Sequence, residues 1–149
     1  MAVVTRLSVS TAEPDGGVPS GGPKPERNVV SPDEERGTID GQAAMAICNA
    51  ITGALKRNSG KGPTKVKAYG TREHVAVIVQ DMLTTLERTL VQEGHEQLVG
   101  EARQALIGRV AKECRATIEQ ATGRRVVGWQ TEVNPSADRS FTLIQLQPL

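Results

Sequence analysis

The stretch Gly60-Lys61-Gly62-Pro63-Thr64-Lys65-Val66-Lys67-Ala68-Tyr69 divides this sequence into two regions with different patterns. Gly60 and Gly62 can take positive φ, and Pro63 lacks an amide donor and biases the residue before it away from the helical region. No helix is therefore expected to continue through this turn. Basic and apolar side chains then alternate over residues 65–69, which predicts a strand directly after the turn.

One amphipathic helix is predicted before the turn. It begins after Asp40, a residue type favoured at N-caps, and ends near Asn58-Ser59-Gly60. Its apolar stripe at helical spacing consists of Ala44, Ile47, Cys48, Ile51 and Leu55.

Helical patterns return in the middle of the chain. Thr84 and Glu87 have the spacing of a capping box, in which each side chain satisfies a free amide at a helix start. Gly94 interrupts this helix, and an apolar stripe then runs at helical spacing over residues 99–121. Gly123 follows as a glycine stop in the left-handed conformation.

The remaining segments predict two hairpins. The β-branched run Val75–Val79 pairs with residues 65–69 across the turn Gly70–Glu73, and Val126–Val133 pairs with Phe141–Leu146 across Asn134–Asp138. The element order is thus α-β-β-α-α-β-β. We predict an α+β fold, a two-layer sandwich with a mostly antiparallel sheet and the helices on one face, and the strand order stays open.

In the strand Val75–Val79, both the odd-numbered and the even-numbered residues are apolar. Because alternate side chains point to opposite faces, such a strand is typical of an inner strand covered on both faces or of a subunit interface. With helices on one face only, we expect a homo-oligomer, most simply a C2 dimer. A central strand covered by the helix at 84–93 is the alternative.

Composition indicates one domain and a tail. The chain has 149 residues, and residues 1–37 hold five of the eight prolines and five of the fifteen glycines, so we expect a disordered tail followed by a single domain at 38–149. Residues 1–40 carry four basic and seven acidic side chains, which leaves fourteen basic and ten acidic side chains in the rest. The three aromatic residues offer little for base stacking, which disfavours a stable nucleic-acid complex.

The basic residues near the turn form the strongest candidate site. Six of them fall within seventeen positions beside free turn amides, so a phosphate, carboxylate or bicarbonate is one hypothesis and a solvated strand face is the other. The turn is not a Walker A motif, because the GxxxxGK[ST] spacing is absent and a strand follows it. The anion or ligand-binding candidates are Lys61, Gly62, Lys65, Lys67 and Arg72, and the structural turn and cap positions are Gly60, Pro63, Thr84, Glu87 and Gly123.

Other reactive side chains lack a motif. His74, His95, Asp81, Glu87 and Asp138 show no metal-ligand spacing, so surface or capping roles are expected and no metal or other cofactor is assigned. No signature such as GxSxG supports a nucleophile, and we expect no enzymatic activity.

The two cysteines and the tryptophan are assigned by their context. Cys48 and Cys114 are interpreted as small buried apolar residues, and a cytoplasmic location follows from the lack of a signal or membrane-spanning pattern. Trp129 either anchors a partner or fills an aromatic-poor core.

Several stretches together resemble the MpsC family. They are GKGPTKVKAY at 60–69, Asp81-Met82-Leu83-Thr84-x-x-Glu87-x-x-Leu90, Thr122-Gly123-Arg124-x-Val126-Val127, and the strand and turn Trp129–Asp138. The resemblance covers roughly residues 38–146 and leaves the tail out. The positions that match the recurring ones of the family are Gly62, Pro63, Thr84, Glu87, Gly123 and Arg124.

The resemblance implies a cytoplasmic accessory or regulatory subunit of a sodium-translocating, membrane-potential-generating system, with partners linked to cation and bicarbonate transport. It brings no catalytic residue with it. Such a subunit docks on a membrane transport subunit without inserting into the membrane. A small-anion or ligand-binding module is the alternative, and a nucleic-acid-binding domain using the basic hairpin is less favoured.

Overall fold

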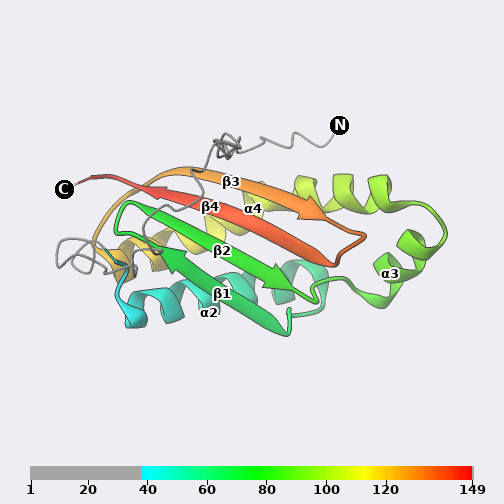
Figure 1. The fold of residues 1–149 in the computed structure, drawn as a ribbon, viewed down its shortest axis with the longest axis horizontal. Helices are drawn as coiled ribbons and strands as arrows, with labels where there is room; N and C mark the ends of the chain where they lie inside the picture. Colours follow the sequence, from blue (N-terminus) through cyan, green and yellow to red (C-terminus); the bar gives the residue numbers. More distant parts are fainter. Residues whose placement is uncertain (1–37, 149) are drawn as a thin grey trace, which may run out of the picture.

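The computed structural model describes residues 38–148, and the predicted tail at 1–37 lies outside these described residues. Seven helices and strands follow one another in the predicted order (Figure 1). They are α2 (Gly41–Ser59), β1 (Lys65–Gly70), β2 (His74–Gln80), α3 (Thr85–Gln92), α4 (Glu96–Thr122), β3 (Val126–Asn134) and β4 (Arg139–Leu146).

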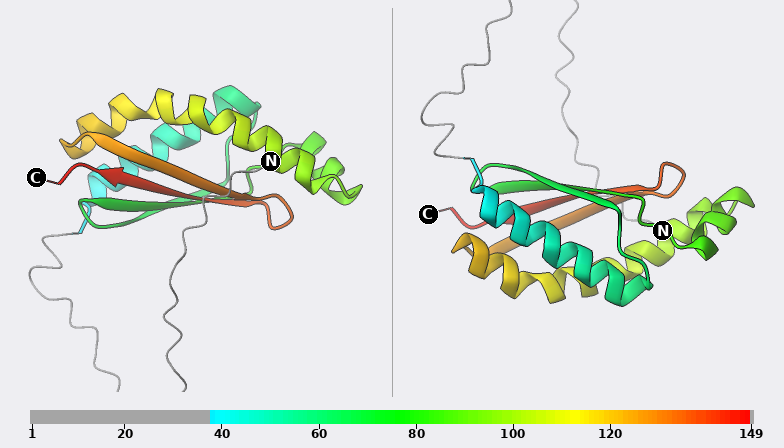
Figure 2. Two further views of the ribbon diagram at one scale, coloured as in Figure 1. Left: turned by 90° about the horizontal axis from the view of Figure 1, so that it is seen from above. Right: turned by 90° about the horizontal axis from the view of Figure 1, so that it is seen from below.

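The four strands form one antiparallel sheet in the order β1-β2-β4-β3. Helices α2 and α4 lie side by side on the same face of this sheet (Figure 2). The predicted two-layer α+β sandwich is confirmed. The strand order, which sequence patterns left open, makes β2 and β4 the inner strands.

The core lies between the sheet and the two long helices. On β2, Val75, Val77 and Val79 are buried while Ala76 and Ile78 are only partly buried. Strand β4 alternates in the same way and buries every second side chain against the helices. The apolar side chains of Val75–Val79 therefore lie on both faces of the sheet. One of these faces packs under the helices, and no described helix covers the other (Figure 2).

Local signals set the ends of the helices as predicted. The Asp40 side chain accepts a hydrogen bond from the amide of Gln42, and Gly60 ends α2 with φ of 83°. Gly123 ends α4 with φ of 69°. In this left-handed region glycine avoids the cost that a β-carbon brings, which accounts for both stops.

Helix α3 and the start of α4 extend beyond the end of the sheet (Figure 1). Thr84 and Glu87 form the predicted capping box at the start of α3. Gly94, with φ of 85°, lies between α3 and α4 as expected. His95 precedes α4 at its N-cap position, where its side chain makes no capping hydrogen bond.

Candidate functional site

Two aspartates from separate turns meet where β2 ends and β4 begins. Gln80 pairs with Arg139 in the sheet, so Asp81 directly after β2 lies opposite Asp138 directly before β4. The amide of Asp81 donates to the carbonyl of Asp138 at 3.0 Å. Both residues have positive φ, 55° and 51°, a conformation that costs energy for residues other than glycine and is maintained by the contacts around it.

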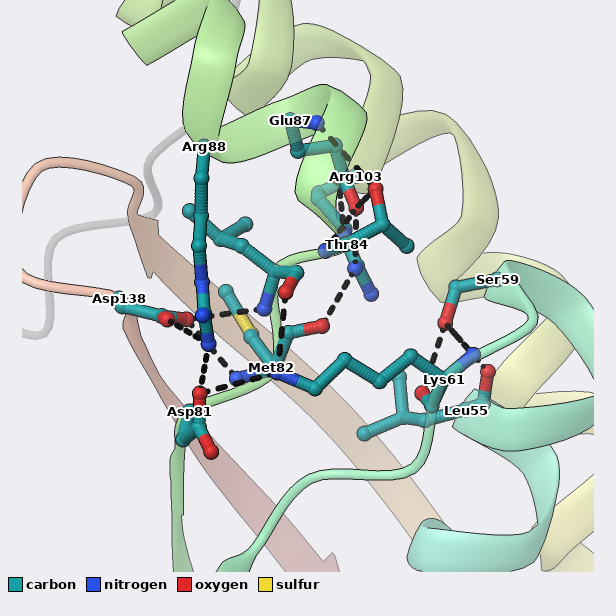
Figure 3. Close-up of polar contacts among 11 residues, drawn as sticks. Leu55, Ser59, Lys61, Asp81, Met82, Thr84, Glu87, Arg88, Arg103 and Asp138 are labelled. Carbon is teal, nitrogen blue, oxygen red and sulfur yellow. Dashed lines mark hydrogen bonds and ion pairs between the residues drawn. The ribbon is translucent and has the colours of Figure 1, made fainter. Parts of the chain in front are cut away.

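Two cations bind the carboxylate of Asp81 (Figure 3). Lys61 Nζ donates to Asp81 Oδ1 at 2.9 Å and to the carbonyl of Leu83 at 3.1 Å. Arg88 Nη2 also donates to Asp81 Oδ1 and lies 3.4 Å from Asp138 Oδ2. Hydrogen bonds from Lys61 and then from Thr64 lower the pKa of Asp81 below its usual value, so this carboxylate stays charged. We call Lys61, Asp81, Arg88 and Asp138 the junction cluster.

The carboxylate of Asp138 also organises the loop before α3. Its Oδ1 accepts hydrogen bonds from the amides of Met82 at 2.8 Å and Leu83 at 2.9 Å. The junction cluster thus joins the turn after α2, the end of β2, helix α3 and the β3–β4 turn. Its two acidic and two basic groups neutralise one another, so the cluster acts as a structural junction of paired charges.

A largely buried ion pair, whose guanidinium is the fully buried partner, lies beside the junction cluster (Figure 3). Arg103 of α4, which is only 4% exposed, donates to both carboxylate oxygens of Glu87 at 2.6 Å and to the carbonyl of Met82 at 2.8 Å. Burial alone raises the pKa of Glu87, but the hydrogen bonds from Arg103 and Thr84 outweigh it and hold that pKa below its usual value. Glu87 therefore caps α3 and anchors it to α4.

Arg103 was missed by the sequence reasoning. It lies four residues after Val99 and seven before Val110, on the apolar face of α4. A basic residue in the middle of an apolar stripe is the signal that points to a buried partner.

A small cavity of about 40 Å³ lies between the sheet and the two long helices. Most of its wall is aliphatic, but Arg103, Thr131, Ser140, Thr142 and Trp129 also line it. Trp129 Nε1 donates to Thr131 Oγ1 at 3.1 Å, and the hydroxyls of Thr131 and Thr142 lie 2.8 Å apart. Among residues 38–148, Arg103 Nη1 is a buried donor without a hydrogen-bond partner. A cavity of this size has space for a water molecule or two, or for one small acceptor group.

The structure distributes the predicted anion-binding residues over three places. Lys61 belongs to the junction cluster, and Gly62 lies against the side chain of Lys56 on α2. Lys65 and Lys67 are exposed on the edge strand β1. Arg72 lies in the β1–β2 turn at the far end of the hairpin, where its carbonyl accepts a hydrogen bond from Arg124 Nη1 at 3.2 Å. These residues do not form one site, and anion binding by any of them stays a prediction.

Fold and site define a small α+β domain with paired charges at one end of its sheet and one sheet face that α2 and α4 leave uncovered. Within the described part of the chain, no helix is long and apolar enough to cross a membrane, and no group of three or more His, Cys, Asp or Glu residues is placed to hold a metal ion. A family model described as MpsC, the Na⁺-translocating membrane potential-generating system, matches residues 40–147. The chain belongs to the MpsC family. Neither the curated proteins nor the solved structures contain a match to it.

Proposed function

We propose that this chain is a non-enzymatic accessory or regulatory subunit of a Na⁺-translocating, membrane-potential-generating system. The family match over residues 40–147 carries this proposal. The subunit is proposed to dock from the cytoplasmic side on a membrane component linked to cation and bicarbonate transport. Among the matching positions, Thr84, Glu87 and Gly123 are helix caps, so they support a scaffold role in which the helices present a surface to a partner.

The corner formed by α3 and the first turn of α4 is the docking surface that we assign to this membrane component. Helix α3 has no buried residue, and Leu86 and Leu98 are 69% and 53% exposed. The junction cluster and the Glu87–Arg103 pair hold this corner on the domain. Exposed apolar side chains on a well-anchored projection are typical of a protein–protein contact.

The experiment measures Na⁺-driven membrane potential in membrane vesicles from source cells that lack the gene. A potentiometric dye reports the potential before and after the purified chain is added to the side corresponding to the cytoplasm. We expect the wild-type chain to restore the potential and a Leu86→Ser/Leu98→Ser variant to restore less.

Met45→Ser is the matched control, since Met45 is 66% exposed on α2 and lies outside the corner. Equal potentials with and without the wild-type chain would contradict the accessory role. Full restoration by the double variant would contradict only the docking surface.

A ligand-binding module is the second candidate function, and the cavity beside Arg103 favours it. The unpaired Nη1 of Arg103 and the hydroxyls of β3 and β4 can bind a small acceptor such as bicarbonate or acetate. Trp129, the single tryptophan, lines the cavity and reports on it by fluorescence. At constant ionic strength, we expect a saturable response to sodium bicarbonate or acetate that Thr131→Val weakens. A linear response that is the same for both salts and for sodium chloride would contradict this candidate.

The subunit is also proposed to be a homo-oligomer, most simply a dimer. Its partly exposed apolar strand positions Ala76 and Ile78 support this assignment, because they lie on the face that α2 and α4 leave uncovered. Light scattering across micromolar concentrations measures the mass directly. One chain mass at every concentration would contradict it.

A further inference from the structure

The sheet face opposite the helices has an apolar centre. Ala76 and Ile78 on β2 and Phe141 and Leu143 on β4 alternate with buried residues, so their side chains point away from α2 and α4. All four are partly exposed. We call this side of the sheet the open face, and Figure 2 shows that both long helices lie on the other side.

The strand register orders charges across the open face. One row of paired residues runs Lys67–Ile78–Phe141–Glu132 from β1 to β3. A basic residue thus ends the row at one edge and an acidic residue ends it at the other, and both are exposed. Strands lie about 4.8 Å apart, so the backbones of Lys67 and Glu132, three strand spacings apart, are separated by about 14 Å. Neither makes an ion pair with another residue in the range 38–148.

One neighbouring row is uncharged, and the other carries two positive charges. The row Tyr69–Ala76–Leu143–Gln130 pairs a small residue with a large one at its centre. The row Lys65–Gln80–Arg139–Asn134 carries its two charges on β1 and β4 and none on β3. If a second copy lies over the first with the order of its strands reversed, no residue of either row lies directly over a residue of like charge.

We propose that the open face binds the open face of a second copy of this chain, with a two-fold axis between the two sheets and parallel to their strands. This inference gives the proposed homo-oligomer its interface and rests on that proposal. Such an axis places β1 of one copy over β3 of the other, so Lys67 meets the partner's Glu132 twice in the dimer. Ile78 then meets the partner's Phe141, and Ala76 meets the partner's Leu143. Face-to-face sheets keep their strands within about 30° of each other, so this row-on-row alignment is compatible with their twist.

Charge selects this axis over the other face-to-face arrangement. A two-fold axis perpendicular to the strands would place β1 over β1, which brings Lys65 and Lys67 close to their own copies. Like charges placed together across an interface oppose association, whereas opposite charges favour it and fix the orientation.

The size of the open face predicts a reversible dimer. Four strands about 4.8 Å apart and about 25 Å long cover about 500 Å² per copy, or about 1,000 Å² in the dimer. Interfaces of this area lie at the lower limit for specific complexes and belong to weak, transient ones. We therefore expect dissociation in the micromolar range and, because the flanking pairs are exposed, a weaker dimer at high salt.

The test uses sedimentation equilibrium of the full chain and of two charge reversals, Lys67→Glu and Glu132→Lys. Each reversal turns two attractive contacts of the dimer into two repulsive ones, so each variant alone is expected to raise the dissociation constant at least tenfold. An equimolar mixture of the two variants is expected to restore the dimer, because both of its cross-interface contacts are again of opposite sign. Lys112→Glu, at an exposed position on α4, is the matched control and should dimerise as the wild type does.

The outcomes separate this interface from the broader proposals. A wild-type chain that is monomeric throughout would overturn the interface and the homo-oligomer together, and the vesicle assay would still judge the accessory role. A wild-type dimer that tolerates both reversals would overturn this interface alone. If each charge-reversal variant alone is a monomer and the equimolar mixture of the two also stays monomeric, the two-fold arrangement would be overturned. Circular dichroism of each variant verifies that it is folded.

Discussion

The buried pair of Glu87 and Arg103 makes the most specific prediction about stability. Glu87→Ala leaves the guanidinium of Arg103, 4% exposed, without the carboxylate that binds it at 2.6 Å through two nitrogens. Removing one partner of a buried pair costs about 3–5 kcal/mol, and losing the reciprocal cap of Thr84 adds about 0.5 kcal/mol or more. We expect Glu87→Ala to lower the free energy of unfolding by about 4 kcal/mol, a large share of the stability of a domain of this size.

Removing both partners should cost much less than the two single losses added together. Arg103→Met keeps an unbranched apolar stem, and Glu87, whose side chain is 16% exposed, keeps the amide of Thr84 and access to water. This change is expected to cost about 1–2 kcal/mol, and the double variant about 2 kcal/mol, because no uncompensated charge remains buried. The expected coupling between the two positions is therefore about 3–4 kcal/mol.

Urea unfolding followed by circular dichroism and by the fluorescence of Trp129 gives the four free energies of this cycle. Thr84→Ala is the control, since it removes only the cap and should cost about 1 kcal/mol. The pair would be refuted as the anchor of α3 if the free-energy losses of Glu87→Ala and Arg103→Met were additive and Glu87→Ala cost about as much as Thr84→Ala.

Four further predictions test other parts of the structure. Folding lowers the pKa values of Glu87 and Asp81 below their usual values of 4.5 and 3.8, so both carboxylates stabilise the fold at pH values above these. This stability is lost as the pH falls through the folded pKa values, and the urea midpoint of the wild type should drop in that acidic range. The difference in stability between the wild type and Glu87→Gln should narrow over the same range. Gly70→Ala should lower the melting temperature more than Gly123→Ala does, because a β-carbon at Gly70 would overlap the carbonyl oxygen of His74. At Gly123 only the left-handed φ opposes a β-carbon, at about 1–2 kcal/mol. Burial raises the pKa of Cys114 to about 11, so iodoacetamide at pH 8 should modify partly exposed Cys48 first, as mass spectrometry of peptides would reveal; equal rates would contradict this. A chain beginning at Thr38 should melt at the same temperature as the full chain, and a drop of several degrees would show that residues 1–37 pack on the domain.

Local physics made most of the elements predictable from the sequence. The turn at 60–64, the capping box of Thr84 and Glu87, and the stops at Gly60 and Gly123 depend on residues a few positions apart. Periodicity then identified helices and strands, because one face of each must be apolar to form the core. The family resemblance was readable for the same reason, since the matching segments are contiguous stretches.

The candidate site was not predictable in this way. Asp81 and Asp138 are far apart in sequence and meet only because β4, rather than β3, pairs with β2. Lys61 was predicted as an anion ligand from its basic neighbours, but it binds Asp81, and Arg72 lies at the other end of the hairpin. A run of like charges in sequence says little about proximity once a hairpin points alternate side chains to opposite faces and separates its two ends.

The sequence alone determined which segments form helices and strands, because capping, turn geometry and period are properties of short segments. It also determined that Val75–Val79 carries apolar side chains on both sides. Only the tertiary structure decided which side the helices cover, which strands are neighbours, and that Lys67 and Glu132 end the same row of the open face. Those outcomes depend on packing between segments distant in the chain, where burial of the whole apolar surface selects one arrangement among several that satisfy the same local patterns.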